Sequence, residues 1–383
     1  MKNHLISGGF FLTFLLFTYK YSPFMKNNCI KIFFCLILFL SIFSCKKEYI
    51  TNEYITNEYI TNEYTTNNVY NSDYYYVYLS EQKEITANIR PSYLTAGDTV
   101  AIIATSNQVT DQQAGINNTK SILQGWGLHV VEAENLYSQD GRYAGTVNER
   151  VVALQKLIDN PNIKALIAAR GGYGCAQIID KLDIIPLKEN PKWIVGFSDL
   201  TAMHAAFNNL GMETIHGVMA YNFSNTTSVN DLKKALFGEY STVSIATNSN
   251  CIEGTTEGRL VGGNLSIIYS LGGTLFDYNM KNAILFIEDT GESNYSLDRM
   301  MMNLRLSGKL SFIKGLVVGQ FTNMTTGIDK SVEEIITDAV KDLNIPVMYG
   351  IQSGHGSPNL PLYLGRPITL EVNSSNATIT FQE

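Results

Sequence analysis

The chain has 383 residues, of which 16% are charged, and its formal net charge at pH 7 is −7. This length can bury a sizeable core in one large domain or in two smaller ones. Because no Lys/Arg-rich run occurs in the sequence, the composition argues against a nucleic-acid-binding protein.

Residues 1–45 have the layout of an export signal. From Met25, "MKNNCIKIFFCLILFLSIFSCKK" has a short basic start, an apolar run and then Ser44-Cys45 before two lysines. This layout resembles a bacterial lipoprotein signal, in which the cysteine becomes the lipidated N-terminus of the mature protein. We therefore expect lipidation at Cys45 and an exported protein, anchored to the membrane at the periplasmic face or the cell surface.

The beginning of the chain leaves alternatives open. We expect Met25 to be the true start and residues 1–24 to be an upstream extension. The alternatives are an uncleaved signal anchor or, because "GGFFLTFLLF" is a second apolar stretch, a hairpin of two short spans. Mass analysis of the N-terminus of the membrane-extracted protein distinguishes these possibilities.

Residues 46–89 begin with two lysines and continue from Glu48 with "EYITNEYITNEYITNEYTTNN", which repeats every five residues. This period matches neither a helix nor a strand, and the segment is too polar to bury a face. We therefore predict a tether that lets the folded body stand off the membrane. A small self-associating stalk built from the Tyr and Ile positions is the alternative.

Residues 90–222 alternate between strand and helix patterns. In chain order they are a strand "TVAIIAT", a helix "QQAGINNTKSILQG", a strand "LHVVEAE", a helix "NERVVALQKLID", and strands "IKALIAA" and "WIVGF" before a last helix. Such alternation predicts an α/β domain with parallel strands and right-handed crossovers.

The second half of the body lacks the regular alternation of strands and helices. Residues 223–254 are moderately polar and are expected to connect two domains. Residues 255–383 mix strands and helices, which predicts a second α/β domain that closes with a C-terminal hairpin. In the first domain "RGGYG" and "GFSD" both follow strands, so they are expected to share a cleft at the carboxyl edge of the sheet.

The chain has five cysteines, Cys29, Cys35, Cys45, Cys175 and Cys251. The first three lie in or at the end of the apolar N-terminal segment, which leaves two for the body. Two cysteines make no disulfide framework, and without a CxxC pair or a His/Cys cluster they predict no zinc site. A single bridge between Cys175 and Cys251 stays open.

Ser198 lies at the turn from the strand "WIVGF" into a helix, and it has two interpretations. It is a helix N-cap, the ordinary use of serine at such a place. Alternatively it is a nucleophile on a sharp strand-to-helix turn. The G-x-S-x-G pattern of such turns is incomplete, because Leu200 stands where the second glycine is needed.

A serine nucleophile needs a histidine base. His204 follows Ser198 by six residues on the same helix, about 9 Å of helix rise away, which is too far to turn back easily. His216 and His355 remain as candidates. His355 lies between two glycines in a polar loop, where it is either functional or a loop histidine bonded to backbone.

The base in turn needs an orienting acid. Glu288 follows the apolar run "AILFI", and a carboxylate at the end of a buried strand requires partners. Asp289 and Glu257 are the alternatives. The two adjacent glycines of "RGGYG" suit either a phosphate loop, although neither known phosphate motif is present, or half of an oxyanion hole. The amide of Asp199 would then supply the other half.

In chain order these pieces resemble the LD-carboxypeptidase family of serine peptidases, which includes muramoyl-tetrapeptide carboxypeptidases and microcin-immunity peptidases. The resemblance covers about residues 90 to 370. Thr105 and Cys175 depart from the usual pattern, where proline and a small polar residue are common. The matching motifs are "RPSYLTAGDTVAIIATS", "YAGTVNERVVAL", "ARGGYGC", "WIVGFSDLTAMH", "HGVMA", "GRLVGGNLSII", "ILFIEDTGE", "SLDRMMMNL" and "SGHG".

The resemblance implies a set of site residues and a fold. Ser198 is the expected nucleophile, His355 the general base, Glu288 its orienting acid, and the amides of Gly172 and Asp199 the oxyanion donors. The expected fold is a flavodoxin-like parallel-sheet domain followed by a C-terminal α/β domain, with the active site at their junction and with homodimers frequent.

The implied reaction releases a C-terminal D-amino acid, such as D-alanine, from murein tetrapeptides without a metal or cofactor. Arg170 and Arg299 are candidate partners for the substrate carboxylate, because a guanidinium binds carboxylates bidentately. One alternative is a peptidase that detoxifies microcin-like peptide-nucleotide conjugates. The other is a non-catalytic lipoprotein that binds peptidoglycan peptides.

Overall fold

The computed structural model describes residues 83–383. The expected export signal, Cys45 and most of the expected tether lie outside this range. Within the described part of the chain, no helix has both the length and the apolar character to cross a membrane.

The last seven residues of the expected tether, 83–89, lie against the folded body. The Ile85 side chain is buried, and Ile89 pairs with Met212 through an isolated β-bridge. The amide of Asn279 also donates to the Lys83 carbonyl. These isoleucines bury apolar surface against the folded body. The body therefore begins before residue 90, which is the boundary that the polar sequence predicts.

The first sheet has the strand order β2-β1-β3-β4-β5-β11. Strands β1 to β5 are parallel, and β11 runs antiparallel to β5. The order 2-1-3-4-5 is that of flavodoxin-like folds, which confirms the expected fold class. The strands are β1 (Thr99–Ile103), β2 (His129–Glu132), β3 (Ile163–Ala168), β4 (Trp193–Gly196), β5 (Thr214–His216) and β11 (Leu362–Leu364).

Helices α5, α6 and α8 lie where the apolar periodicity predicts them, whereas the short helix α7 was not predicted. The capping box of Thr146 and Glu149 shows why α6 begins where it does, since each side chain bonds the other's backbone N–H. The helices are α5 (Gln113–Gly125), α6 (Val147–Asp159), α7 (Pro186–Glu189) and α8 (Thr201–Asn209).

The segment 223–254 is more ordered than a simple connection. It contains helix α9 (Thr226–Phe237) and strand β6 (Thr242–Ala246), which pairs with β13 at the edge of the second sheet. Only one face of β6 is covered, so its sequence lacks the apolar run that marks a buried strand. Its partner lies more than a hundred residues further along the chain, beyond the reach of local pattern.

The second sheet has the order β10-β9-β8-β7-β12-β13-β6. Strands β7 to β10 are parallel, whereas β12, β13 and β6 are antiparallel. The β12–β13 pair is the expected C-terminal hairpin. The elements are β7 (Gly254–Asn264), β8 (Ile284–Thr290), β9 (Gly315–Thr322), β10 (Val347–Gly354), β12 (Pro367–Val372), β13 (Asn376–Phe381), α10 (Leu265–Leu271), α11 (Asn294–Leu306) and α12 (Val332–Val340).

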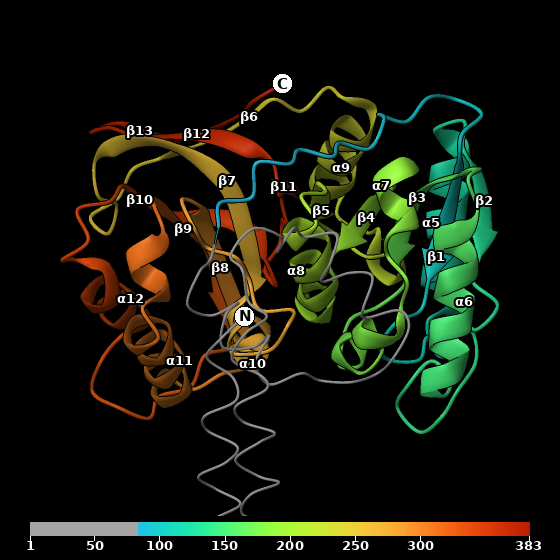
Figure 1. Ribbon diagram of the computed structural model, residues 1–383, viewed down its shortest axis with the longest axis horizontal. Coiled ribbons are helices and arrows are strands. Elements are labelled where there is room, and N and C mark those ends of the chain that lie inside the picture. Colours follow the sequence, from blue (N-terminus) through green and yellow to red (C-terminus); the bar gives the residue numbers. More distant parts are fainter. Residues whose placement is uncertain (1–82) are drawn as a thin grey trace, which may run out of the picture. The chain divides into compact units, whose positions relative to one another are not determined.

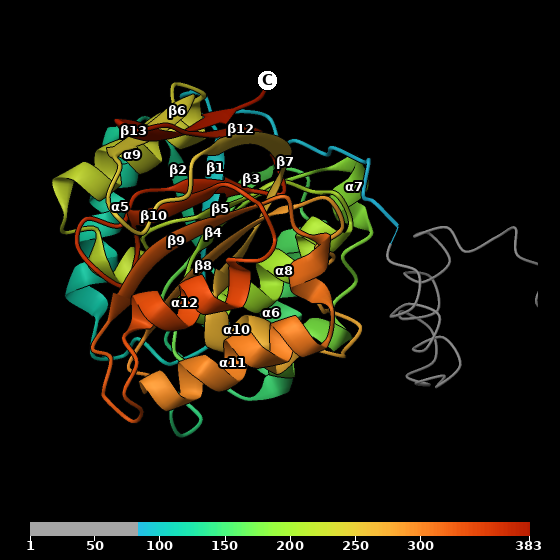
Figure 2. The same ribbon diagram turned by 90° about the vertical axis from the view of Figure 1, so that its left-hand side faces the viewer.

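The two sheets are joined through α8, which packs against both β7 and α10 (Figure 1). Thr201 at the start of α8 accepts the backbone N–H of Asn264, and its carbonyl accepts from the Tyr278 hydroxyl at 3.4 Å. Figure 2 shows α10, α11 and α12 on one side of the second sheet, away from the β12–β13 hairpin. This arrangement brings the carboxyl ends of β4, β8 and β10 together.

Candidate active site

Ser198 lies on a strained turn between β4 and α8. Its backbone φ is 61°, in the left-handed region that costs an L-residue about 1–2 kcal/mol. Ser198 begins a 3₁₀ turn, Ser198–Leu200, and neither this turn nor α8 has a side-chain cap. The N-cap interpretation is therefore wrong, and the hydroxyl points elsewhere.

The hydroxyl of Ser198 contacts His355, which in turn contacts Glu288. Ser198 Oγ is 3.0 Å from His355 Nε2, and His355 Nδ1 is 2.6 Å from Glu288 Oε2. With Nδ1 protonated, His355 donates to the carboxylate and accepts from the hydroxyl. The structure therefore brings together three residues that lie 157 and 67 positions apart in the chain.

Glu288 is ionised in this setting although it is fully buried near the end of β8. Burial alone raises its pKa, but the neighbouring imidazoles of His216 and His355 outweigh burial and bring the pKa down to about 2. The His355 side chain is 18% exposed, so the imidazole faces solvent while its partner carboxylate does not. A buried anion that holds Nδ1–H is suited to stabilising a positive imidazole.

The alternative acids have other roles in the structure. The Asp289 carboxylate accepts from the Asn264 side chain and from the backbone of Ser266, each at 2.9 Å, and so holds the start of α10. Its burial raises its pKa to about 6. Glu257 is exposed on β7, where Thr369 donates to it at 3.4 Å.

His204 is satisfied by its own neighbours. Its ring nitrogens lie 2.9 Å from Thr214 Oγ1 and 2.9 Å from the Gly196 carbonyl, and burial lowers its pKa to about 3. It is therefore neutral and structural. His216 is also buried, and its Nε2 lies 3.9 Å from Glu288 Oε1.

The "RGGYG" backbone passes directly beside the nucleophile. A Cβ placed on Gly171 would lie 3.5 Å from Ser198 Oγ, and a Cβ on Gly172 would collide with the Asn107 side chain at 2.2 Å. Gly172 also has a φ of 115°, which favours glycine. The glycines thus allow this loop to approach the serine, while the role of the Gly172 amide stays a prediction.

The side chain of Asp199 points away from the site and ties this loop to the turn that carries Ser198. It accepts from Ser106 Oγ at 2.5 Å and from the backbone N–H of Cys175 at 2.9 Å.

The two cysteines of the body do not form a disulfide. Burial raises the pKa of the Cys175 thiol, and both Cys175 and Cys251 are free, so the bridge left open by the sequence does not form.

Arg150 is a residue that the sequence reasoning missed. Its buried guanidinium donates to the carbonyls of Thr105 and Gly174, each at 3.0 Å, and to the Gln177 side chain. These bonds connect the segment after β1 with the end of the RGGYG segment, residues 170–174, which we call the glycine loop. The signal was present, because an arginine inside the apolar face of helix α6 requires buried partners.

The two candidate arginines are placed differently. Arg170 follows β3 and is partly exposed. Its guanidinium donates to the Gln108 carbonyl and forms an ion pair with Asp111, with 3.5 Å between Nη1 and Oδ1. Arg299 lies on α11 over the exposed ring of Tyr295, and none of its described contacts is with Ser198, Glu288 or His355. Their binding of a substrate carboxylate stays a prediction.

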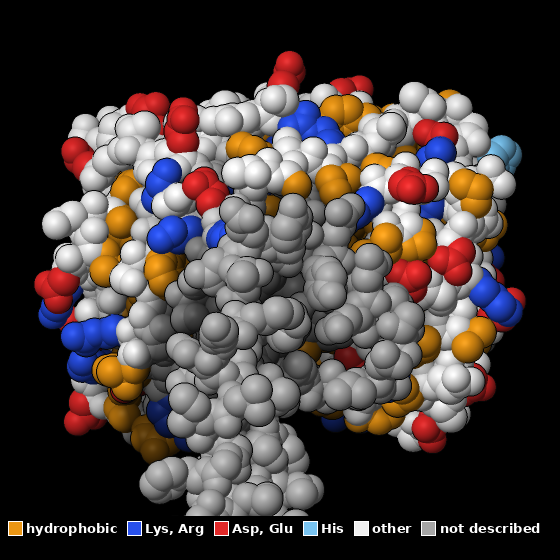
Figure 3. All heavy atoms as spheres, in the orientation of Figure 1, with side chains coloured by type: hydrophobic (Ala, Val, Ile, Leu, Met, Phe, Trp, Pro, Cys, Tyr) orange, Lys and Arg blue, Asp and Glu red, His pale blue; other side chains and the backbone are white. Residues whose placement is uncertain are grey.

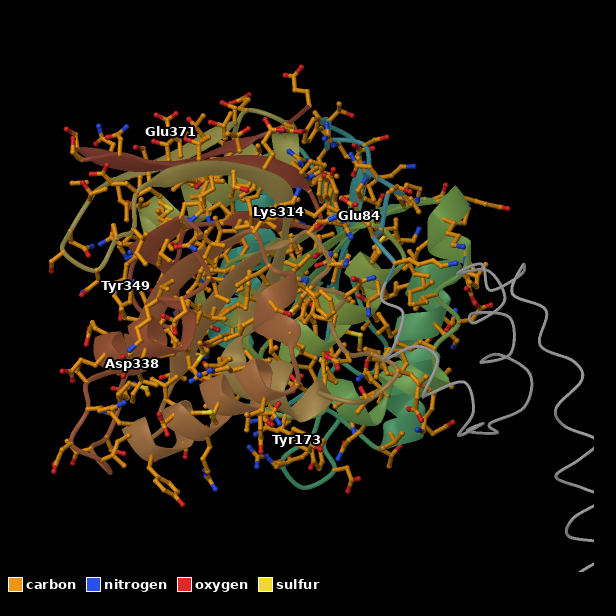
Figure 4. All side chains as sticks on the ribbon, turned by 60° about the vertical axis from the view of Figure 1, so that its left-hand side comes forward. Glu84, Tyr173, Lys314, Asp338, Tyr349 and Glu371 are labelled. Atoms are coloured by element: carbon orange, nitrogen blue, oxygen red, sulfur yellow. The ribbon has the colours of Figure 1, made fainter. Side chains whose placement is uncertain are left out.

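The surroundings of the site include an exposed aromatic side chain. Tyr173 in the glycine loop is 44% exposed, and it lies at the lower edge of the molecule in Figure 4. Its ring is 6.5 Å from that of Tyr143. Within residues 83–383, no group of three or more His, Cys, Asp or Glu side chains is arranged to hold a metal ion.

Two family models match the chain. Residues 100–217 match the model described as LD-carboxypeptidase N-terminal domain, and residues 257–370 match the LD-carboxypeptidase C-terminal domain. A Bacillus subtilis protein named "Probable murein peptide carboxypeptidase" is 31% identical over 303 residues, which span 76% of this chain and 94% of that protein. The "Murein tetrapeptide carboxypeptidase" of Pseudomonas aeruginosa is 29% identical, over 72% of this chain and 93% of its own.

Solved structures show the same fold. The muramoyltetrapeptide carboxypeptidase of Oxalobacter formigenes is 25% identical with a TM-score of 0.67, and the match covers 74% of this chain and 99% of that one. A structure of the microcin C7 self-immunity protein MccF has a TM-score of 0.69 at 24% identity, and the match covers 78% of this chain and 99% of that one. In sequence, the MccF protein of Escherichia coli is 26% identical over 76% of this chain and 95% of its own.

Proposed function

Because the chain belongs to the LD-carboxypeptidase family of serine peptidases, we propose that it hydrolyses an L,D-amide bond to release a C-terminal D-amino acid, D-alanine, from murein tetrapeptides. The observation that carries this proposal is the hydrogen-bonded series from Ser198 through His355 to Glu288. It is supported by relatives whose names specify murein peptides as substrates.

In the proposed reaction, Ser198 Oγ attacks the scissile carbonyl while His355 takes its proton. Glu288 orients the imidazole and stabilises its positive form. The amides of Gly172 and Asp199 donate to the oxyanion, and one such donor is worth about 3 to 4 kcal/mol in other enzymes. His355 then protonates the leaving D-amino acid, and water hydrolyses the acyl-enzyme.

We further propose that the protein acts outside the cytoplasm, anchored by a lipid on Cys45, and that it forms homodimers. Its substrates would then be cell-wall peptides or their fragments. The signal layout supports the anchor, and radiolabelled palmitate incorporated by the full chain but not by Cys45→Ala would test it. A wild-type chain without label would refute it.

The function is tested by mass spectrometry of muropeptides before and after treatment with the full-length protein. We expect tetrapeptides to become tripeptides with release of D-alanine. Ser198→Ala should lose at least about a thousandfold in rate, because no other group replaces the nucleophile. Ser121→Ala, on the exposed side of α5, is the matched control.

Two outcomes would count against the proposal. Release of D-alanine by Ser198→Ala at the wild-type rate would remove the assigned nucleophile. Cleavage of a peptide-nucleotide conjugate, with tetrapeptides left intact, would favour the function named for the MccF relative.

A further inference from the structure

His216 is a buried titratable group that the proposed reaction does not use. It is the last residue of β5, its side chain has no exposed surface, and its ring lies between the rings of Phe197 and Phe286. The centroid distances are 5.8 Å and 5.0 Å, both edge-on. An imidazole in such an apolar position is costly unless its nitrogens have partners.

One nitrogen of His216 faces the carboxylate of the triad. Nε2 lies 3.9 Å from Glu288 Oε1, and among the described residues neither atom has a hydrogen-bond partner. The other oxygen, Oε2, is bound by His355 at 2.6 Å. The buried carboxylate thus lies between two imidazoles, with one ring at each oxygen.

The opposite nitrogen of His216 is held by a serine. Ser353 Oγ lies 3.3 Å from Nδ1 and 2.8 Å from the Leu360 carbonyl oxygen, so its single hydrogen has two acceptors within reach. When the hydroxyl donates to Nδ1, the neutral ring carries its own hydrogen on Nε2. Ser353 and Gly354 form the end of β10, directly before His355. His216 is therefore linked to the loop of the base as well as to the acid.

We propose that His216 is a positioning residue for the triad: its Nε2–H faces Glu288 Oε1 and holds the carboxylate so that Oε2 stays aimed at His355. The distance of 3.9 Å is longer than a hydrogen bond but within the range of an electrostatic contact. Because Oε1 has no hydrogen-bond partner among the described residues, this electrostatic contact is what opposes rotation of the carboxylate away from His355.

This proposal rests on the proposed function, because it assumes that Ser198 is activated through His355. The variants Glu288→Gln and Ser198→Ala therefore cannot test it. His216→Gln keeps an N–H donor near the position of Nε2, whereas His216→Met has a similar length and no donor. Comparing the two variants separates the effect of the N–H donor from the effect of side-chain packing.

For kinetics on tetrapeptide, His216→Met should lower kcat about tenfold or more with KM unchanged, and His216→Gln should stay within about threefold of wild type. Loss of the donor makes Glu288 a stronger acceptor for His355. The acid limb of the kcat/KM profile should therefore move to higher pH in His216→Met. Equal losses in the two variants, with the acid limb unmoved, would overturn the proposal.

The pH profile involves three titratable groups packed around this position, namely Glu288 on β8, His355 after β10 and His204 on α8. ¹⁵N NMR of histidine-labelled full-length protein reads their ring nitrogens without any substrate. A protonated Nε2 on His216 is expected between pH 6 and 8, and an unprotonated Nε2 there would overturn the proposal. If wild type cleaves no tetrapeptide, the proposed function fails while this measurement still decides the role of His216.

Discussion

Ser198 has a backbone conformation that glycine adopts more easily. Its φ of 61° places the Cβ in a region of steric conflict. We expect Ser198→Gly to be more stable than Ser198→Ala by about 1 kcal/mol, because both variants lack the hydroxyl and only alanine keeps the Cβ. Urea unfolding of the two proteins measures this difference. A Ser198→Ala protein as stable as Ser198→Gly would show that the turn is not strained.

Glu288 is a second single residue with a measurable effect: its ionisation should make the free energy of unfolding depend on pH. Its pKa is about 2 in the folded protein and about 4.3 in an unfolded chain, so its ionisation stabilises the fold fully above about pH 5. This contribution is lost as the pH falls toward 2. The difference in the free energy of unfolding between wild type and Glu288→Gln should therefore shrink from pH 5 to pH 2.5 in denaturant titrations. A difference that stays constant over this range would contradict the assigned pKa.

Among the secondary-structure elements, the pairing of strand β7 with strand β8 positions Glu288. Gly262 on β7 has a φ of 132°, and a Cβ there would lie 1.9 Å from the Phe286 carbonyl of β8. Gly262→Ala should lower the free energy of unfolding by at least about 2 kcal/mol, because backbone must move. Gly125→Ala, where a Cβ meets open space at the end of α5, is the control. Equal urea midpoints for the two variants would contradict this account of the strand contact.

At the scale of the described molecule, the two halves share structure. Strand β11 follows the segment that carries His355 yet completes the first sheet, and Arg259 on β7 donates to the carbonyls of Asn208 and Gly365. Lys/Arg and Asp/Glu side chains are interspersed on the face in Figure 3, with no separate charged half.

We therefore expect the two halves to unfold together. Both tryptophans, Trp126 and Trp193, lie in the first half, so their fluorescence reports that half while far-ultraviolet circular dichroism reports both. The two signals should give the same urea midpoint. Separate midpoints would mean that β11 and α8 do not couple the halves.

Local sequence pattern predicts much of the fold and limits the candidate site to a few residues. Apolar runs and strand-to-helix alternation predict β1 to β4 with α5, α6 and α8, because these features depend on neighbours within a few residues. The turn marks Ser198, the glycine-flanked loop marks His355 and the buried strand marks Glu288, but these local features leave His216, Asp289 and Glu257 open as alternatives. The resemblance to a family is what selects the first three. Their catalytic roles stay predictions.

The tertiary structure alone decided which of the alternatives meet. It placed Glu288 rather than Asp289 at the histidine, because successive side chains of β8 point to opposite faces. It also placed β6 and β11 in their sheets, and His216 at the second oxygen of Glu288. These contacts join residues far apart in the chain, and their distances depend on how the whole chain packs. No local pattern contains that information.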